Sequence, residues 1–255
     1  MVDIHSHILP DQDDGARTFE EALSMVRMAA AAGTTDIVAS PHANSRFAFD
    51  PTVVKRKIAE LQRAAGDAAH IHYGCDFHLT PENIEDAIAA PGKYSIDHQG
   101  YILVELSDSM VPRKMDRIFT RMLAAGLRPI VTHPERNPLL QKKLPELELW
   151  VQQGCLVQVT AQSLVGRFGR SAKSAGGELM RRGLVHVLAS DAHDCTDRPP
   201  LLDEAWRYTA RHYGEETARL LLEANPRAVL TGADLPLPEI EVQKRTWFSR
   251  FHWRR

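Results

Sequence analysis

Two histidines and a group of acidic residues stand together in the first fifteen positions, MVDIHSHILPDQDDG. Successive side chains of a strand alternate between its two faces, so His5 and His7 in a strand here point in the same direction. Three carboxylates, Asp11, Asp13 and Asp14, follow in the turn behind them. Imidazole nitrogens and carboxylate oxygens together suit divalent transition-metal ions. The opening segment therefore predicts part of a metal site, and spacing alone does not select among the three carboxylates.

The elements that must position such a site are short apolar runs alternating with longer amphipathic stretches. This alternation is typical of repeated strand and helix units around a parallel sheet or barrel, so the predicted fold class is α/β. Strands are expected over residues 2–7, 36–40, 70–77, 101–106, 129–132, 156–160 and 185–189. Helices are expected over residues 18–32, 51–65, 81–89, 113–125, 138–153 and 171–182, with two more between 200 and 224.

Further potential metal ligands fall where the predicted strands end. They are His42 in Ser-Pro-His, Asp76, Glu105, His133 in Thr-His-Pro-Glu-Arg, and Asp191 and His193 in Ser-Asp-Ala-His. In an α/β barrel the loops after the strands converge on one face, so these residues and the opening segment are expected to meet in one cleft. Taken singly, Asp76 or Glu105 could instead be a salt-bridge partner or a helix cap. His78 lies close to this set in sequence and stays unassigned.

A cluster of this kind suits the hydrolysis of a phosphate ester. Two metal ions about 3.5 to 4 Å apart clamp the attacking and leaving oxygens of a phosphoryl transfer and lower the pKa of bound water. Arg136 and Arg198 lie in loops on the same predicted face. Guanidinium groups there could bind phosphate oxygens bidentately, and the alternative is plain surface charge.

The composition is that of an ordinary globular chain of 255 residues, with 44% hydrophobic residues and a formal net charge of −2. This charge gives no case for nucleic-acid binding. There is no apolar run of membrane length and no signal-peptide pattern at the start, so we expect a cytoplasmic protein. The composition changes near Leu235, which divides the chain into a domain over residues 1–234 and a tail over residues 235–255.

The last residues of that tail, QKRTWFSRFHWRR from Gln243 to Arg255, alternate cations with aromatic side chains. Such a segment could dock to a membrane surface or to an acidic partner. A solvated tail without a partner is an equal alternative.

The segments DIHSH, DDG, SPH, THPERN and SDAH resemble the polymerase and histidinol phosphatase (PHP) superfamily. Within it, the chain is most similar to the CpsB/YwqE-type manganese-dependent protein tyrosine phosphatases, over roughly residues 1–232. This resemblance implies a distorted (β/α)7 barrel of the PHP type, with its metal site at the C-terminal ends of the strands.

The resemblance also implies a distribution of ligands among two or three divalent ions. His5, His7 and Asp191 would hold a first ion, Glu105 and His133 a second, and Asp14, His42 and His193 a third. Asp76 would bridge the first two ions, where many superfamily members carry the longer Glu. Manganese is the ion that the resemblance implies, and the donor set also admits Fe, Zn, Co or Mg.

The implied reaction is hydrolysis of phosphotyrosine, with Arg136 binding phosphate and Arg198 lying near the substrate. The implied substrate is a bacterial tyrosine autokinase that controls capsule or exopolysaccharide synthesis. A classical cysteine phosphatase would place Arg six positions after its nucleophile, where this chain has Pro81, Ala161 and Leu201. Two alternatives remain open. One is a small-molecule phosphate monoesterase of the histidinol-phosphatase type, and the other is a metal-binding regulatory module without turnover.

Overall fold

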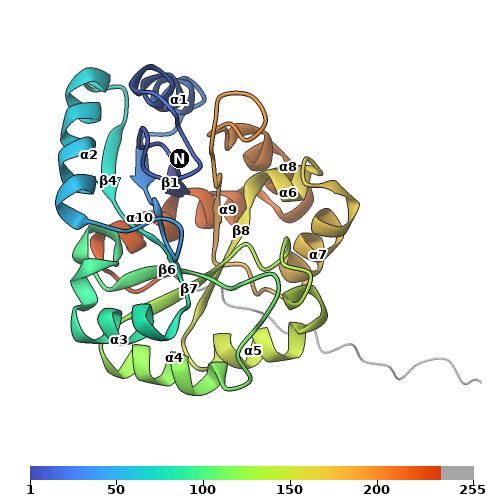
Figure 1. Ribbon diagram of the computed structural model, residues 1–255. Coiled ribbons are helices and arrows are strands. Elements are labelled where there is room, and N and C mark those ends of the chain that lie inside the picture. Colours follow the sequence, from blue (N-terminus) through green and yellow to red (C-terminus); the bar gives the residue numbers. More distant parts are fainter. Residues whose placement is uncertain (237–255) are drawn as a thin grey trace, which may run out of the picture.

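The computed structural model describes residues 1–236, in which every paired strand runs parallel to its neighbours (Figure 1). A three-stranded sheet has the order β1 (Val2–Ser6), β2 (Asp36–Ala39) and β4 (His70–Tyr73). A six-stranded sheet has the order β3 (His42–Ala43), β5 (Asp76–His78), β6 (Tyr101–Glu105), β7 (Arg128–Thr132), β8 (Leu156–Thr160) and β9 (Val187–Ala189). The predicted α/β class is confirmed. Strands lie in all seven expected stretches, but β3 was not expected and one stretch is divided, so the described residues hold nine strands rather than seven.

The expected strand over residues 70–77 is divided into β4 and β5, which belong to different sheets. The division falls at Gly74, where an added Cβ would lie 2.5 Å from Cγ1 of Val38. Only glycine lets the chain pass so close to β2. The alternation of apolar residues at Ile71, Tyr73, Cys75 and Phe77 continues through Gly74, so the hydrophobic pattern carries no sign of this change of sheet.

The two sheets also meet through β1 and the segment after β9. His7 donates its backbone N–H to Ala192 at 2.8 Å, and Asp191 donates to the carbonyl of His5 at the same distance. Ser6 and Ala192 form an isolated parallel bridge. These contacts bring the end of β1 beside the end of β9, although the two strands belong to different sheets.

The helices lie outside the strands (Figure 1). They are α1 (Phe19–Ala31), α2 (Pro51–Ala65), α3 (Pro81–Ala89), α4 (Met115–Ala124), α5 (Leu144–Gln152), α6 (Ala161–Val165), α7 (Gly169–Arg181), α8 (Asp203–Tyr213), α9 (Glu215–Arg219) and α10 (Asn225–Thr231). The first three begin where predicted because Thr18, Asp50 and Thr80 accept hydrogen bonds from the first backbone N–H groups.

Two helix predictions need correction. The helix expected from residue 138 begins at Leu144, because the side-chain oxygen of Asn137 binds the N–H groups of Leu139 and Leu140 and closes a turn there. The short helices α6 and α10 were not predicted. Each has fewer than eight residues, too few to show a helical repeat.

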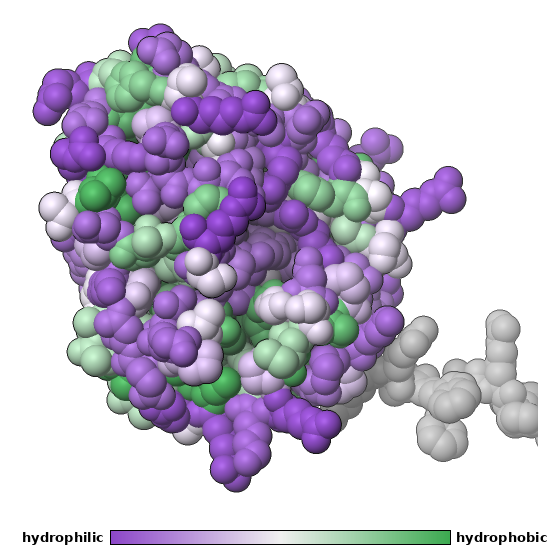
Figure 2. All heavy atoms as spheres, viewed as in Figure 1, coloured by the Kyte–Doolittle hydropathy of each residue, from purple (hydrophilic) through white to green (hydrophobic). Residues whose placement is uncertain are grey.

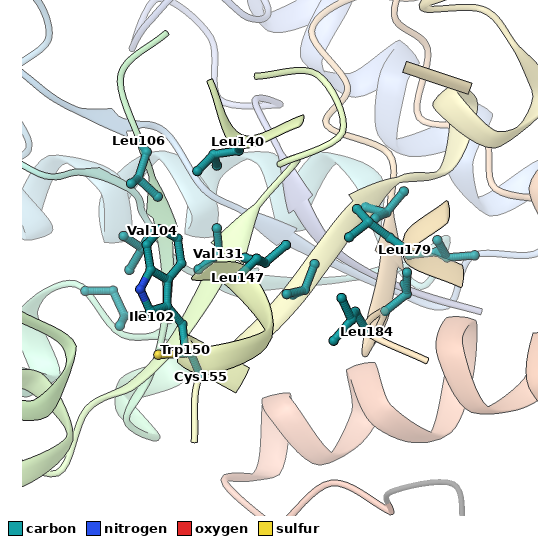
Figure 3. Packing of buried hydrophobic residues seen from close by; sticks show 14 of the residues in the cluster. Ile102, Val104, Leu106, Val131, Leu140, Leu147, Trp150, Cys155, Leu179 and Leu184 are labelled. Carbon is teal, nitrogen blue, oxygen red and sulfur yellow. The ribbon is translucent and has the colours of Figure 1, made fainter. Parts of the chain in front are cut away.

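A hydrophobic core between the six-stranded sheet and the helices outside it holds these strands in place (Figure 3). Ile102, Val104 and Val131 point from β6 and β7 toward Leu147 and Trp150 of α5. The ring of Trp150 meets that of Phe119 edge to face, with their centroids 5.3 Å apart. The close packing of these buried apolar side chains stabilises the sheet and its helices. It also fixes the ends of the strands, where the candidate ligands lie.

No helix within residues 1–236 has the length and apolar character needed to cross a membrane. The basic aromatic segment at residues 243–255 and the docking role predicted for it lie outside the described residues.

Candidate metal centre

The structure brings all of the predicted metal ligands together at the C-terminal ends of the strands. They are His5 in β1, His7 just after it, Asp14 in the following turn, His42 in β3, Asp76 in β5, Glu105 at the end of β6, His133 after β7, and Asp191 and His193 after β9. In Figure 2 the face seen in Figure 1 is hollowed near its centre, and hydrophilic side chains line the hollow. A polar substrate therefore has room on this face.

The alternation of side chains along β1 directs two imidazoles to one place, as predicted. Nε2 of His5 lies 3.3 Å from Nε2 of His7. The intervening residue Ser6 faces away and donates to the carbonyl of Val38 at 2.7 Å.

Four sets of donor atoms lie close enough to share an ion, with the atoms of each set within 4.8 Å of one another. The sets are His7, Asp14, His42 and His193; His42, Asp76, His78 and Glu105; His5, His7 and Asp76; and His5, His133 and Asp191. Asp76 and three of the histidines belong to two sets each, so the site is one continuous cluster.

This grouping differs from the one that the family resemblance implies. His133 lies with His5 and Asp191, whereas Glu105 lies with His42, Asp76 and His78. Nε2 of His133 is 3.8 Å from Oε1 of Glu105, so the expected pair are still neighbours. Asp76 stands between two sets, 3.7 Å from Nε2 of His5 and 3.0 Å from Nδ1 of His42.

Sequence reasoning left His78 unassigned, and the structure places it inside the cluster. Its signal was present in the sequence. Asp76 and His78 are two residues apart in the short strand β5, so both side chains leave the strand on the same face, as those of His5 and His7 do at the end of β1.

The structure also distinguishes the three carboxylates of the first turn. Only Asp14 belongs to a donor set, with its Oδ1 3.3 Å from Nε2 of His42. Asp13 instead binds Nδ1 of His7 at 2.7 Å and the backbone N–H of His42 at 3.0 Å. Asp11 is exposed and its carbonyl accepts from Lys57. Asp13 therefore orients a ligand, and Asp14 is the carboxylate that reaches the cluster.

Other partners fix the imidazole rings in the same way. Nδ1 of His5 lies 3.0 Å from Oε1 of Gln158, and Nδ1 of His193 lies 3.0 Å from the carbonyl of Asp191. A ring whose Nδ1–H donates to an oxygen leaves Nε2 free to bind an ion. The sequence carries no sign of Gln158 and offers Asp13 only as a possible metal ligand, because a residue that only orients a ligand has no characteristic spacing.

Burial and neighbouring charges shift the pKa values of the side chains in the cluster. Burial disfavours the charged form of His5, yet the carboxylates of Asp191 and Asp76 raise its pKa to about 9. Burial acts against the ionised Asp191 as well, and His5 and Arg198 nevertheless hold the pKa of this carboxyl well below its usual range. Burial dominates at His133 and lowers its pKa to about 3.

The buried carboxylates suit a divalent cation. Oδ1 of Asp76 is buried and has no hydrogen-bond partner among the described residues. Oδ2 of the same carboxylate lies near the ring nitrogens of His5 and His42. A buried carboxylate oxygen without a donor is costly, and an ion held between Asp76 and the neighbouring imidazoles would satisfy it. The residues therefore fit the metal that the sequence predicts.

Both predicted arginines lie beside the cluster. Arg136 donates to Oδ2 of Asp191, and Arg198 donates to the same oxygen at 2.5 Å. About a quarter of each arginine side chain is exposed, so each can meet a ligand from solvent. His133 and Asp191 have positive φ angles of 31° and 52°, a strained conformation for such residues that is often found at functional sites.

The cysteines take no part in this arrangement. Cys75 and Cys155 are buried, and Cys195 is half-buried. Burial, followed by the charge of Asp76, raises the pKa of the Cys75 thiol well above its usual value. A thiol of this kind is a poor nucleophile.

A model of the family described as "Capsular polysaccharide synthesis, CpsB/CapC" matches residues 1–231. The chain belongs to the CpsB/CapC family. It is 32% identical to the putative tyrosine-protein phosphatase CapC of Staphylococcus aureus, over 98% of this chain and 99% of the relative. It is 30% identical to the tyrosine-protein phosphatase YwqE of Bacillus subtilis (strain 168), over 98% of this chain and all of YwqE.

The similarity of this CpsB/CapC chain to solved structures agrees with its sequence. A structure from a study of YwqE from Bacillus subtilis and CpsB from Streptococcus pneumoniae, described as "unique metal-dependent tyrosine phosphatases", superposes with a TM-score of 0.86. That match covers 92% of this chain and 96% of the other, at 30% identity. A dihydroorotase from Campylobacter jejuni, with a TM-score of 0.55 and 12% identity, shares the fold alone.

Proposed function

We propose that the protein is a metal-dependent phosphatase that hydrolyses phosphotyrosine in proteins. The observation that carries this proposal is the continuous cluster of imidazoles and carboxylates with two arginines bound at its edge. The similarity to YwqE and CapC over nearly the full chain supports tyrosine phosphate as the substrate class. The same similarity favours a protein tyrosine phosphatase over a histidinol-phosphatase type of monoesterase and over a regulatory module without turnover.

The cluster would hold two or three divalent ions, with manganese first and Fe, Zn, Co or Mg as alternatives. Its ligands would be the nine predicted residues together with His78. We also propose that the two sheets together form the distorted barrel of the PHP type. When bound, the ions supply Lewis acidity and lower the pKa of water enough to give hydroxide near neutral pH.

The protein's own residues would bind and orient the phosphate group. Arg136 and Arg198 present guanidinium groups that match phosphate oxygens and offset the charge that develops on them. Asp191 holds both arginines toward the cluster. The departing tyrosine oxygen has a pKa near 10, so it leaves without strong help from a general acid.

The proposed protein substrate is a tyrosine autokinase of capsule or exopolysaccharide synthesis, dephosphorylated in the cytoplasm. The family description, capsular polysaccharide synthesis, supports this biological setting. We further propose residues 1–234 as the catalytic domain and residues 235–255 as a docking tail for the kinase or for the membrane beside it. Deletion of residues 240–255 should then slow turnover of the intact kinase and spare small substrates, whereas equal loss on both would refute the docking role.

The deciding experiment is turnover of a phosphotyrosyl peptide by metal-stripped protein reconstituted with Mn²⁺. His133→Ala should abolish the metal-dependent release of phosphate, and His212→Ala, which changes an exposed histidine of α8, should not. Faster turnover of histidinol phosphate than of the peptide would assign the protein to the alternative enzyme. If no divalent metal supports turnover of either substrate, the protein would instead be a metal-binding regulatory module.

A further inference from the structure

The unpredicted helix α6 joins the two loops that carry the arginines. On one side it holds the His133–Arg136 turn through the buried side chain of Glu135. Oε1 of Glu135 accepts hydrogen bonds from the hydroxyl of Ser163 at 2.7 Å and from the backbone N–H of Thr160 at 3.0 Å. The loop after β7 is therefore attached to the start of α6.

On the other side α6 holds the loop that follows β9. The side-chain amide of Gln162 donates to the carbonyl of Pro199 at 2.6 Å, immediately after Arg198. Gln162 and Ser163 are both buried, so water does not compete for these contacts. One short helix thus sets the separation of two loops that are far apart in sequence.

The chain leaves α6 through a turn that places Phe168 against both guanidinium groups. Gly166 and Gly169 flank this turn with φ angles of 96° and 84°, which favour glycine. The guanidinium carbon of Arg136 lies 4.2 Å from the centroid of the Phe168 ring, and that of Arg198 lies 5.9 Å from it. Both distances are within the range of a cation–π interaction.

Each guanidinium therefore has two fixed neighbours, the carboxylate of Asp191 and the ring of Phe168. The carboxylate attracts both arginines to a single oxygen, where two like charges repel each other. The face of an aromatic ring attracts cations without supplying a competing hydrogen-bond acceptor. The ring can thus hold the arginines in place while leaving their N–H groups able to meet an anion.

We propose that Phe168 is a positioning residue that holds Arg136 and Arg198 ready to bind the phosphate of the substrate. This proposal rests on the proposed function, because it takes the two arginines as the phosphate-binding groups. It predicts that Phe168 acts on phosphate affinity through the arginines and leaves metal binding alone.

The test compares Phe168→Leu, which keeps apolar volume but removes the ring face, with Phe168→Tyr, which keeps that face. Inorganic phosphate is titrated into the Mn²⁺-loaded protein, and KM and kcat are measured with a phosphotyrosyl peptide. Phe168→Leu should weaken phosphate binding and raise KM by about three- to tenfold with unchanged metal content, and Phe168→Tyr should restore both. The matched control is Phe19→Leu, at a half-buried phenylalanine of α1 that packs in another part of the core.

A double-mutant cycle separates positioning from general packing. In a variant that carries Arg136→Met and Arg198→Met, the further change Phe168→Leu should leave the residual phosphate affinity unaltered. An unchanged phosphate affinity in the single variant Phe168→Leu overturns the proposal. The same loss with and without the arginines, or a loss of bound Mn²⁺, overturns it too. Failure of the proposed function would look different, since wild-type protein would bind phosphate and turn over no phosphotyrosyl peptide.

Discussion

Nε2 of His78 lies 2.5 Å from Oε2 of Glu105, and 3.1 Å from Nδ1 of His42. The three side chains come from neighbouring strands of the six-stranded sheet, β5, β6 and β3. With Asp76 they form a set of four donors in which two are imidazoles and two are carboxylates. Such a set can bind a transition-metal ion without help from His5 or His7.

Substitution of His78 tests this set. His78→Gln removes an imidazole donor while keeping a polar side chain, so it should lower the affinity for Mn²⁺ more than tenfold at one position of the cluster. Competition with a metal chelator measures that affinity directly. His98→Gln, at an exposed histidine, is the matched control. Wild-type affinity in His78→Gln would exclude a ligand role for this residue.

The first acidic turn offers a second test with its own control. Asp13→Asn weakens the acceptor that fixes Nδ1 of His7 and should lower metal affinity about 10- to 100-fold, because partners of ligands contribute that much. Asp11→Asn changes an exposed carboxylate of the same turn and should have no effect. Metal titration of both variants provides the comparison. If Asp13→Asn and Asp11→Asn bind the metal with equal affinity, His7 is oriented without Asp13.

The pattern of strand ends predicted which side chains would lie together, because it depends on few assumptions. Parallel strands present their C-terminal ends to one side, and alternation along β1 aligns His5 with His7. What the pattern could not show depends on tertiary contacts. The sheet change at Gly74 is set by the distance to Val38, and the orienting role of Gln158 is set by the meeting of β8 with β1. Neither contact leaves a periodic trace in the sequence.

His186 should give the folded protein a distinct dependence on pH. Burial lowers its pKa from 6.5 to about 4, and its Nδ1 accepts the backbone N–H of Val157 at 3.1 Å. The unfolded chain binds the proton more readily, so stability is fully present above pH 6.5 and is lost as pH falls toward 4. The loss should approach about 3 kcal/mol. Urea unfolding of wild type and His186→Asn at several pH values measures this loss of stability. If the free energy of unfolding depends on pH in the same way in both proteins, His186 is not its cause.

The hydrophobic core behind β6 and β7 should set stability without altering the chemistry of the site. Phe119 is fully buried and packs edge to face on Trp150. Phe119→Ala should lower the free energy of unfolding by about 3–5 kcal/mol, since it removes a large buried ring and leaves a cavity. Urea unfolding measures this loss, and the Mn²⁺ content of the folded variant should stay at the wild-type level. Loss of metal in the folded variant would show that the core and the site are not independent.

The candidate ligands come from both sheets, with His5 in β1 of the three-stranded sheet and Asp76 and Glu105 in β5 and β6 of the other. An ion shared among them would therefore be a further crosslink between two sheets that already meet through β1 and the segment after β9, and it would tie residue 5 to residue 191 across most of the chain. Opening either sheet would release the ion. Metal loading should thus slow amide hydrogen exchange in both sheets together, and such a result would give the ion a part in the cooperativity of unfolding beside its proposed part in the reaction.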